Sequence, residues 1–171
     1  IDNFSSGHKK NLNHHSNNKN LDLIKLNILE KNKLNKIFKD VDHVFHFAGV
    51  GDIVPSIENP SYYIANNVIG TLNILEACKT SKIKKFVYAA SSSCYGIATV
   101  PTKENHPINT LYPYAISKYQ GEQLALHWSK VYKIPTNSIR IFNAYGPRVR
   151  TTGAYGAVFG VFLNKNYLIK I

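Results

Sequence analysis

Apolar runs of strand length alternate with amphipathic segments of helical length along most of the chain. We expect strands at residues 21–28, 41–49, 84–90 and 135–142 and helices at residues 30–40, 62–80 and 114–132, with a polar loop at 8–20 and a turn at 55–60. Strands that are separated by helices favour a parallel sheet covered on both faces. The sequence therefore predicts an α/β fold with a doubly wound parallel sheet.

Residues that are unusual in a strand pattern follow three of the expected strands. The expected strand at 41–49 ends in small residues, the last of which is Gly49. Ser91 follows the strand at 84–90, and Asn143 follows the strand at 135–142. Open α/β sheets bind their ligands at the carboxyl ends of their strands. A glycine there lets a ligand approach the backbone closely. We therefore expect a binding site at this edge of the sheet.

A candidate catalytic group lies between Ser91 and Lys118. A serine triplet begins at Ser91, and Tyr114 and Lys118 stand four residues apart on the expected helix at 114–132. Residues four apart share a helix face, so the lysine ammonium can approach the phenol and favour its ionised form. Such a phenol can take a proton from a sugar hydroxyl and return it, with Ser91 relaying or orienting the proton. An ordinary surface tyrosine and lysine would show the same spacing; the serine triplet favours chemistry.

The composition favours a soluble, cytoplasmic globular protein. Hydrophobic residues make up 44% and charged residues 18%, and no apolar run reaches the about 18 residues that span a membrane. No secretory signal is visible, and Cys78 and Cys94 lack the spacing of metal ligands, as is typical of a reducing compartment. The net charge of +11 resides largely in lysines mixed with asparagines, without a nucleic-acid motif. We interpret this charge as solvated surface and expect no nucleic-acid or membrane partner.

The first residues contain one candidate ligand contact and one pattern that we reject. Asp2 stands where a strand has just ended, the place of a carboxylate that binds the adenosine ribose of NAD and repels the 2′-phosphate of NADP. The adjacent His14 and His15 cannot easily share one metal site and have no third ligand at suitable spacing. The chain begins at Ile1 and ends at Ile171 in mid-pattern. We therefore expect a piece of a longer protein, and no metal site.

Seven short motifs, taken in this order, resemble the extended short-chain dehydrogenase/reductase family of NAD-dependent nucleotide-sugar epimerases and dehydratases. They are Asp2–Gly7, His46–Gly49, Asn67–Thr71, Ser91–Gly96, Tyr114-x-x-x-Lys118, Arg140–Asn143 and Tyr145–Arg148. The greatest similarity is to UDP-hexose 4-epimerases, including those that act on N-acetylhexosamines. The resemblance implies a Rossmann-like fold whose first strand and glycine-rich turn precede residue 1, and whose C-terminal substrate domain mostly follows residue 171.

The resemblance also assigns roles within two regions. Residues 1–150 would be a partial NAD-binding domain with the catalytic residues, and residues 151–171 the start of the nucleotide-sugar-binding region. The implied catalytic residues are Ser91, Tyr114 and Lys118; the implied NAD contacts are Asp2, Asn3, Ser6, Asn27, Ile28, Phe47, Ala48, Gly49, Asn67 and Lys118; and the implied substrate contacts are Ser92, Ser93, Asn143, Ala157 and Val158. Asn27 departs from the aspartate that such enzymes carry against adenine. Without its missing ends, the chain alone is expected to bind NAD poorly and to be inactive.

The residues after Ser91 narrow the implied reaction. Dehydratases of this family place Asp-Glu there as acid and base, and decarboxylating members commonly carry a glutamate, whereas this chain has Ser92 and Ser93. The resemblance thus implies 4-epimerisation of a UDP-sugar through a transient 4-keto sugar, in polysaccharide biosynthesis, by a homodimer that pairs through the helices at 62–80 and 114–132. Three alternatives stay open: a sister enzyme such as a UDP-glucuronate epimerase, dehydratase or reductase; a non-catalytic NAD-binding protein; and a basic nucleic-acid binder.

Overall fold

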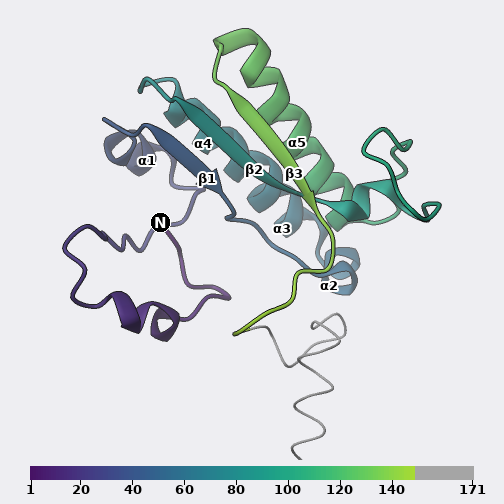
Figure 1. The fold of residues 1–171 in the computed structure, drawn as a ribbon, viewed down its shortest axis with the longest axis horizontal. Coiled ribbons are helices and arrows are strands. Elements are labelled where there is room, and N and C mark those ends of the chain that lie inside the picture. Colours follow the sequence, from purple (N-terminus) through teal and green to yellow (C-terminus); the bar gives the residue numbers. More distant parts are fainter. Residues whose placement is uncertain (149–171) are drawn as a thin grey trace, which may run out of the picture.

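A three-stranded parallel sheet forms the centre of the molecule in a computed structural model that describes residues 1–148. The strands are β1 (His43–His46), β2 (Lys85–Ser91) and β3 (Thr136–Ile141), in the order β1-β2-β3 (Figure 1). Phe86 in the middle strand is in register with Val44 on one side and Thr136 on the other. The predicted parallel α/β arrangement of these three strands is confirmed, with a shorter first strand than the sequence indicated.

The expected strand at residues 21–28 is wrong for most of its length. Only Lys25 forms a bridge, to Asp2, through hydrogen bonds from Asp2 N–H to the Ile24 carbonyl (3.1 Å) and from Leu26 N–H to the Asp2 carbonyl (3.1 Å). A ladder needs a partner along its whole length, and within residues 1–148 this segment has one only at Asp2. Its apolar residues Leu26 and Ile28 still enter the core.

Helices lie before the first strand and occupy most of the segments between the strands. They are α1 (Lys31–Ile37), α2 (Ile53–Glu58), α3 (Pro60–Ile64), α4 (Gly70–Cys78) and α5 (Pro113–Tyr132), with a π-helical segment η2 (Ala65–Ile69) between α3 and α4 and 3₁₀-helices η1 (Lys9–His15) and η3 (Ser92–Tyr95). The helices expected at 30–40, 62–80 and 114–132 are thus confirmed, the second as a continuous run of α3, η2 and α4. The polar loop expected at 8–20 contains η1.

The turn expected at residues 55–60 is wrong. Pro55 is the third residue of α2, and Pro60 is the first residue of α3. Proline is tolerated in the first helical turn because the N–H that it lacks has no partner within the helix there. Asn59 separates the two helices, and its side chain accepts a hydrogen bond from the Tyr62 N–H at the start of α3.

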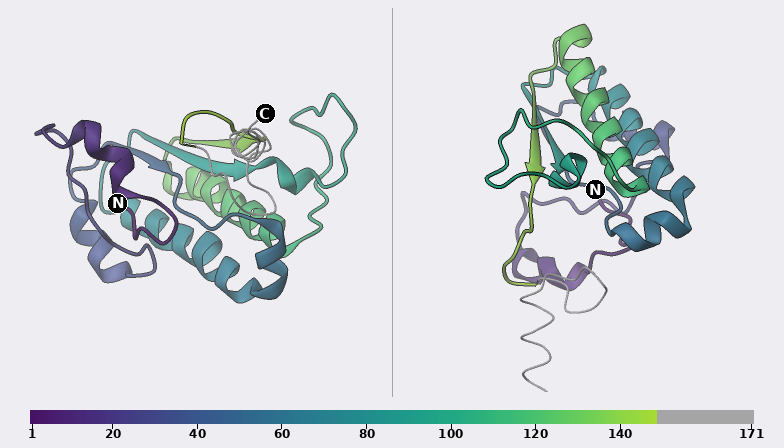
Figure 2. Two further views of the ribbon diagram at one scale, coloured as in Figure 1. Left: turned by 90° about the horizontal axis from the view of Figure 1, so that it is seen from below. Right: turned by 90° about the vertical axis from the view of Figure 1, so that its right-hand side faces the viewer.

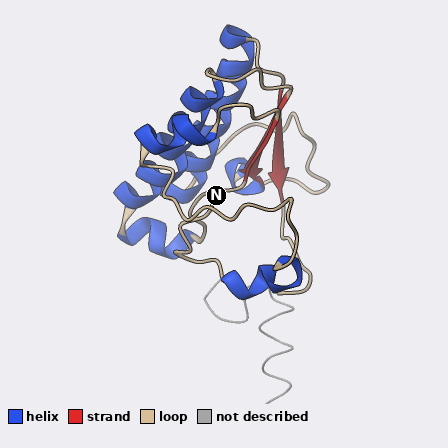
Figure 3. Cartoon of the chain, turned by 90° about the vertical axis from the view of Figure 1, so that its left-hand side faces the viewer, coloured by secondary structure: helices blue, strands red, loops and turns tan. Residues whose placement is uncertain are grey.

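Helices cover one face of the sheet in the described part of the chain. Figures 2 and 3 show α1, α3, α4 and α5 gathered on the same side of the strands. Side chains in a strand alternate between the two faces, and accordingly Val44 and His46 of β1 are buried while Phe45 is 68% exposed. Ile139 of β3 is 47% exposed. Residues 1–148 place no helix on this second face, so the expected covering of both faces stays a prediction.

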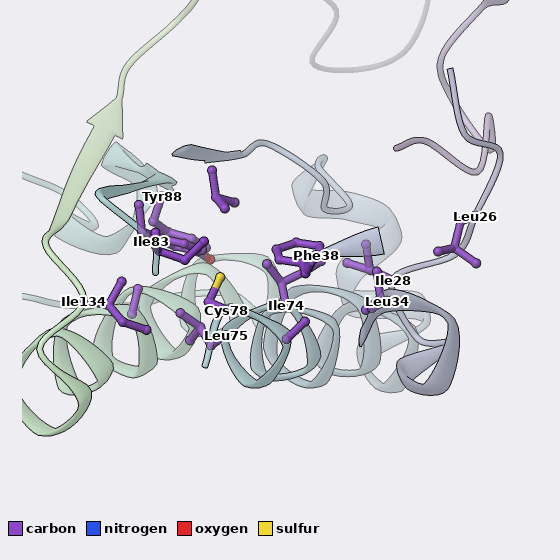
Figure 4. Close-up of a cluster of buried hydrophobic side chains, with 14 of the residues drawn as sticks. Leu26, Ile28, Leu34, Phe38, Ile74, Leu75, Cys78, Ile83, Tyr88 and Ile134 are labelled. Atoms are coloured by element: carbon purple, nitrogen blue, oxygen red, sulfur yellow. The ribbon is translucent and has the colours of Figure 1, made fainter. Parts of the chain in front are cut away.

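The core lies between the sheet and these helices (Figure 4). Phe86 of β2, Leu75 and Cys78 of α4 and Leu34 of α1 are fully buried. Burying a side chain of the size of leucine or phenylalanine contributes about 1.5–3 kcal/mol, so this layer is the main source of stability for the parts that carry the site. No helix within residues 1–148 combines the length and the apolar character needed to cross a membrane.

Candidate active site

Two adjoining cavities lie at the carboxyl edge of the sheet. The first has a volume of about 340 Å³ and the second about 430 Å³, and both are lined by Phe47, Gly49 and Val50, which follow β1. They therefore form one cleft along the ends of the strands, at the edge where the sequence places a ligand.

The first cavity brings together the N-terminal residues and the segment after β1. Its lining includes Asp2, Asn3, Ser6, Ile28, Phe47, Ala48 and Gly49. One carboxylate oxygen of Asp2 accepts the Phe4 N–H at 2.6 Å, which fixes the carboxylate beside the cavity. Asn27 is not part of this lining, because its side-chain oxygen accepts the Leu29 N–H at 3.0 Å within its own turn.

The second cavity brings together the residues in which the sequence predicts chemistry. Ser91, Ser92 and Ser93 line it from the end of β2, Tyr114 and Lys118 line it from α5, and Asn143 lines it from the segment after β3. These residues are separated by up to about fifty positions in sequence, and the parallel sheet is what gathers them. The other two expected substrate contacts, Ala157 and Val158, lie outside the described residues.

Residues 91–95 form a turn, the serine turn, that is held by hydroxyls of the serine triplet. Ser91 ends β2 and caps η3, where its Oγ accepts the Ser93 N–H at 3.2 Å. The Oγ atoms of Ser91 and Ser93 are 2.8 Å apart, at hydrogen-bond distance. The Ser91 side chain is thereby oriented at the wall of the second cavity, where a hydroxyl can pass on or orient a proton.

Lys118 is a buried cation. The residue is 7% exposed, its Nζ lies 4.7 Å from the ring centre of Tyr88, and no carboxylate of residues 1–148 forms an ion pair with it. Burial lowers the pKa of Lys118 to about 8, so that the ammonium persists at neutral pH at an energetic cost. Tyr114, one helical turn earlier, packs edge-on against Tyr63 at a ring-centre distance of 6.3 Å. Tyr114 and Lys118 line the same cavity.

Asn67 fastens the turn that separates the two cavities. Its Oδ1 accepts the Val50 N–H at 2.7 Å, and its Nδ2 donates to the Val50 carbonyl at 3.0 Å and to Ser117 Oγ at 2.9 Å. Asn67 is 1% exposed and lies in η2; π-turns of this kind often occur at functional sites. In the structure the amide of Asn67 holds Val50 to Ser117 of α5, and its expected contact with the cofactor stays a prediction.

The shape around Gly49 fits a cofactor that approaches the backbone. A Cβ at Gly49 would lie 2.8 Å from Asn67 Oδ1 and 3.7 Å from Lys118 Nζ, so a side chain there would displace the amide and crowd the ammonium. The backbone at Gly49 has room only for glycine, Lys118 is buried close to it, and Asp2 lines the first cavity. These are the features that a dinucleotide site requires. The residues present therefore fit NAD.

His46 is a second buried group that supports the segment after β1, through Thr71 and Asn67. His46 Nε2 lies 2.8 Å from Thr71 Oγ1, and the Thr71 hydroxyl donates to the Asn67 carbonyl at 2.7 Å, so the histidine is the donor to the threonine. Burial, with a smaller effect from the Lys118 charge, lowers the pKa of His46 to about 3 and keeps its imidazole neutral. His46 thus joins the end of β1 to the helical layer without adding a second cation.

The sequence did not identify the supporting residues. Ser117, Tyr88 and the Glu122–Arg140 pair contact residues distant in the chain. Ser117 and Arg140 lie within recognised motifs, but the sequence assigned neither of them a role. A signal was available for Glu122, which is four residues after Lys118 and eight after Tyr114, and so shares their helix face. Within residues 1–148, no three His, Cys, Asp or Glu side chains come together to hold a metal ion.

Comparison with known protein families gives a match over nearly the whole chain. The model of the NAD dependent epimerase/dehydratase family matches residues 1–168. A candidate UDP-glucose 4-epimerase of Methanocaldococcus jannaschii is 39% identical over 168 residues, which are 96% of this chain and 53% of that protein. The chain therefore spans about half the length of this curated relative.

Solved structures of the same kind are similar in fold. The UDP-N-acetylglucosamine 4-epimerase of Methanobrevibacter ruminantium M1, in complex with UDP-N-acetylmuramic acid, is 35% identical with a TM-score of 0.93, covering 98% of this chain and 54% of that one. The UDP-glucuronic acid 4-epimerase of Bacillus cereus, in complex with UDP-glucuronic acid and NAD, is 31% identical with a TM-score of 0.82, covering 91% of this chain and 49% of that one.

Proposed function

This chain belongs to the NAD-dependent epimerase/dehydratase family, and on that premise we propose that the whole protein is a nucleotide-sugar 4-epimerase, acting on a UDP-sugar through a transient 4-keto sugar. The observation that carries the proposal is the shared cavity of Ser91, Tyr114 and Lys118, which adjoins the cavity lined by Asp2 and Gly49. A proton-transfer group and a dinucleotide cradle thus lie in one cleft. That is the requirement for oxidising a sugar hydroxyl and reducing it again.

Tyr114 is the general base and acid in this proposal. As phenolate it takes the proton of the sugar 4-hydroxyl, and as phenol it returns the proton after the 4-keto sugar has turned its other face. Lys118 keeps a positive charge beside Tyr114 because its pKa of about 8 leaves it protonated at neutral pH. Ser91, oriented by its contacts with Ser93, hydrogen-bonds the same sugar oxygen and orients the proton.

The remaining residues of the cleft hold and place the cofactor. Asp2 would bind the adenosine ribose, with Asn3 and Ser6 near it, and Phe47, Ala48 and Gly49 would line the pyrophosphate and the second ribose, to which Lys118 also donates. When bound there, NAD would supply the hydride acceptor for oxidation at C4 and, once reduced, the hydride donor. Asn67 contributes by holding Val50, and Asn143 would contact the sugar diphosphate.

The serine turn favours epimerisation over elimination. Ser92 and Ser93 line the second cavity where dehydratases resembling this chain carry an acid and a base. A hydroxyl is too weak an acid and base at neutral pH to assist loss of water. A UDP-glucuronate 4-epimerase is the second candidate, because the Bacillus cereus enzyme of that activity shares the fold and 31% of the aligned sequence.

The test uses the full-length protein, obtained by extending the reading frame in both directions. It is incubated with UDP-glucose, UDP-N-acetylglucosamine or UDP-glucuronate without added cofactor, and inversion at C4 is followed by proton NMR. We expect inversion of one of the first two sugars. Inversion of UDP-glucuronate would establish the second candidate. A dehydrated, decarboxylated or 4-keto product would assign a sister activity, and no reaction with NAD still bound would favour a non-catalytic protein.

A further inference from the structure

A buried ion pair lies directly behind the serine turn. Arg140 of β3 and Glu122 of α5 are 20% and 5% exposed in their side chains, and Arg140 Nε lies 3.1 and 3.0 Å from the two carboxylate oxygens of Glu122. The other three ion pairs found within residues 1–148 are more exposed or join neighbouring turns of one helix or loop. Taking two charges out of water is costly, and apolar residues could fill the same space. The pair therefore calls for a reason other than stability.

The Arg140 guanidinium also binds the end of the serine turn. Its Nη1 donates to the Tyr95 hydroxyl at 2.9 Å and to the Glu104 carbonyl at 3.1 Å, and its carbon atom lies 4.9 Å from the centre of the Tyr95 ring. Tyr95 is the last residue of η3, the short helix that Ser91 caps. Burial lowers the pKa of Arg140, but its hydrogen bonds to Glu122 and Tyr95 raise it by more, so the guanidinium stays charged.

The loop between η3 and α5 is tied to the same place. The Tyr95 hydroxyl is 3.3 Å from the Glu104 carbonyl, and the Asn109 N–H donates to the Cys94 carbonyl at 2.9 Å. Gly96 has a φ of 64°, and a Cβ there would overlap the Asn109 carbonyl. The loop thus folds back on η3, and the Arg140 side chain connects both to α5 through Glu122.

Each partner of the ion pair is placed next to one half of the catalytic group. Glu122 is one helical turn after Lys118 and two turns after Tyr114, on the same face of α5. Arg140 is in register with Ala90 on β2, and the next pair in that register is Ser91 with Ile141. The ion pair therefore links the helix that carries the base to the strand end and turn that carry the serine.

We propose that Glu122 and Arg140 are positioning residues that set the distance between Ser91 and the Tyr114–Lys118 pair through the Tyr95 contact. This inference rests on the proposed function, since it assigns the pair to proton transfer at the sugar. A guanidinium suits the task, because its planar fork of donors binds a carboxylate, a hydroxyl and a carbonyl in one fixed geometry. Neither residue is among those that line the cavity. Substitution of either residue should therefore lower kcat and leave KM nearly unchanged.

The experiment compares variants of the full-length protein in two measurements. Glu122→Gln removes the charge and keeps the side-chain shape, and Tyr95→Phe removes only the hydroxyl that binds the guanidinium. Asp42→Asn is the matched control, because it breaks the Lys84–Asp42 pair, whose side chains are 68% and 56% exposed. Amide hydrogen exchange at residues 92–109 reports the turn without requiring any reaction. Steady-state kinetics, scaled to the NAD-bound fraction, report kcat and KM.

We expect exchange at residues 92–109 to rise in Glu122→Gln and Tyr95→Phe. We expect kcat to fall about 10–100-fold in the first and about 3–10-fold in the second, with KM within about threefold of the unmodified protein in both. The double variant should lie within about threefold of Glu122→Gln alone, because both changes act through one guanidinium. Asp42→Asn should change neither measurement.

Two results would overturn the proposal. An unchanged kcat per NAD-loaded site, with faster exchange, would mean that the pair only stabilises the fold. Unchanged exchange in Tyr95→Phe would mean that the hydroxyl does not hold the turn, and this variant decides the question if Glu122→Gln fails to fold. If the unmodified protein inverts no sugar, the proposed function fails, and the exchange measurement still decides whether the pair holds the turn.

Discussion

Replacing Lys118 by methionine should make the protein more stable while it abolishes activity. The pKa of Lys118 falls from 10.5 to about 8 on folding because of burial. At about 1.4 kcal/mol per pH unit, holding the charge in the folded state costs about 3 kcal/mol at neutral pH. The contact with the Tyr88 ring returns about 1–2 kcal/mol. Lys118→Met should therefore raise the free energy of unfolding by about 1–2 kcal/mol at pH 7.

The pH dependence identifies the cause. Between pH 8 and 10.5 the unfolded chain binds a proton at Lys118 that the folded chain has released, so the stability of the unmodified protein rises with pH in this window. The advantage of the variant should accordingly be full below pH 8 and shrink above it. Urea unfolding of NAD-free full-length protein at pH 7.0 and 9.5 measures this, with Lys84→Met, an exposed lysine, as the control. A variant that is less stable at pH 7, or an advantage that is constant with pH, would refute the reasoning.

Three further changes test the support of the cleft. Gly49→Ala should lose bound NAD and about 1–3 kcal/mol of stability, because its Cβ would lie 2.8 Å from Asn67 Oδ1 and displace the amide. The absorbance of bound cofactor measures the first loss, and a melting curve measures the second. Gly121→Ala should destabilise by a similar amount of about 1–3 kcal/mol, since its Cβ would lie 2.8 Å from the Asn67 carbonyl; an unchanged melting temperature would show that α5 is not packed this tightly. Stability should fall as the pH decreases below 6.5, because unfolded His46 then gains a proton that the folded form, with a pKa of about 3, refuses. His46→Gln should flatten that slope in urea titrations between pH 7 and 4.5.

The sequence correctly predicted the strands and helices that depend on the apolar periodicity of a single segment. The strands at β1, β2 and β3 and the long helix α5 follow from their apolar periodicity, and their parallel order follows from the intervening helices. Residues 21–28 have the same apolar composition but form only one bridge, because strand formation depends on a partner and not on the segment alone. The residues at 55–60 were misassigned because proline is compatible with a first helical turn as well as with a bend.

The reactive residues of the site could be predicted from the sequence, but the buried contacts that hold them in place could not. Ser91, Tyr114 and Lys118 are recognisable from residue type, spacing and their place after strand ends, and the structure gathers them at one cavity. The structural contacts of Asn67 were not predicted: its amide binds Val50, 17 residues away, and Ser117, 50 residues away. Such separations carry no local signal, because the contact exists only once the sheet and helices have packed.

The central claim is that Tyr114 transfers the proton at the sugar. The most direct test measures C4 inversion by proton NMR in the full-length protein, in Tyr114→Phe and in Tyr132→Phe, which changes a tyrosine at the opposite end of α5 that is 42% exposed. We predict that Tyr114→Phe retains NAD and lowers the inversion rate at least about 100-fold, while Tyr132→Phe inverts the sugar at the normal rate. Inversion at the normal rate in Tyr114→Phe would contradict the account.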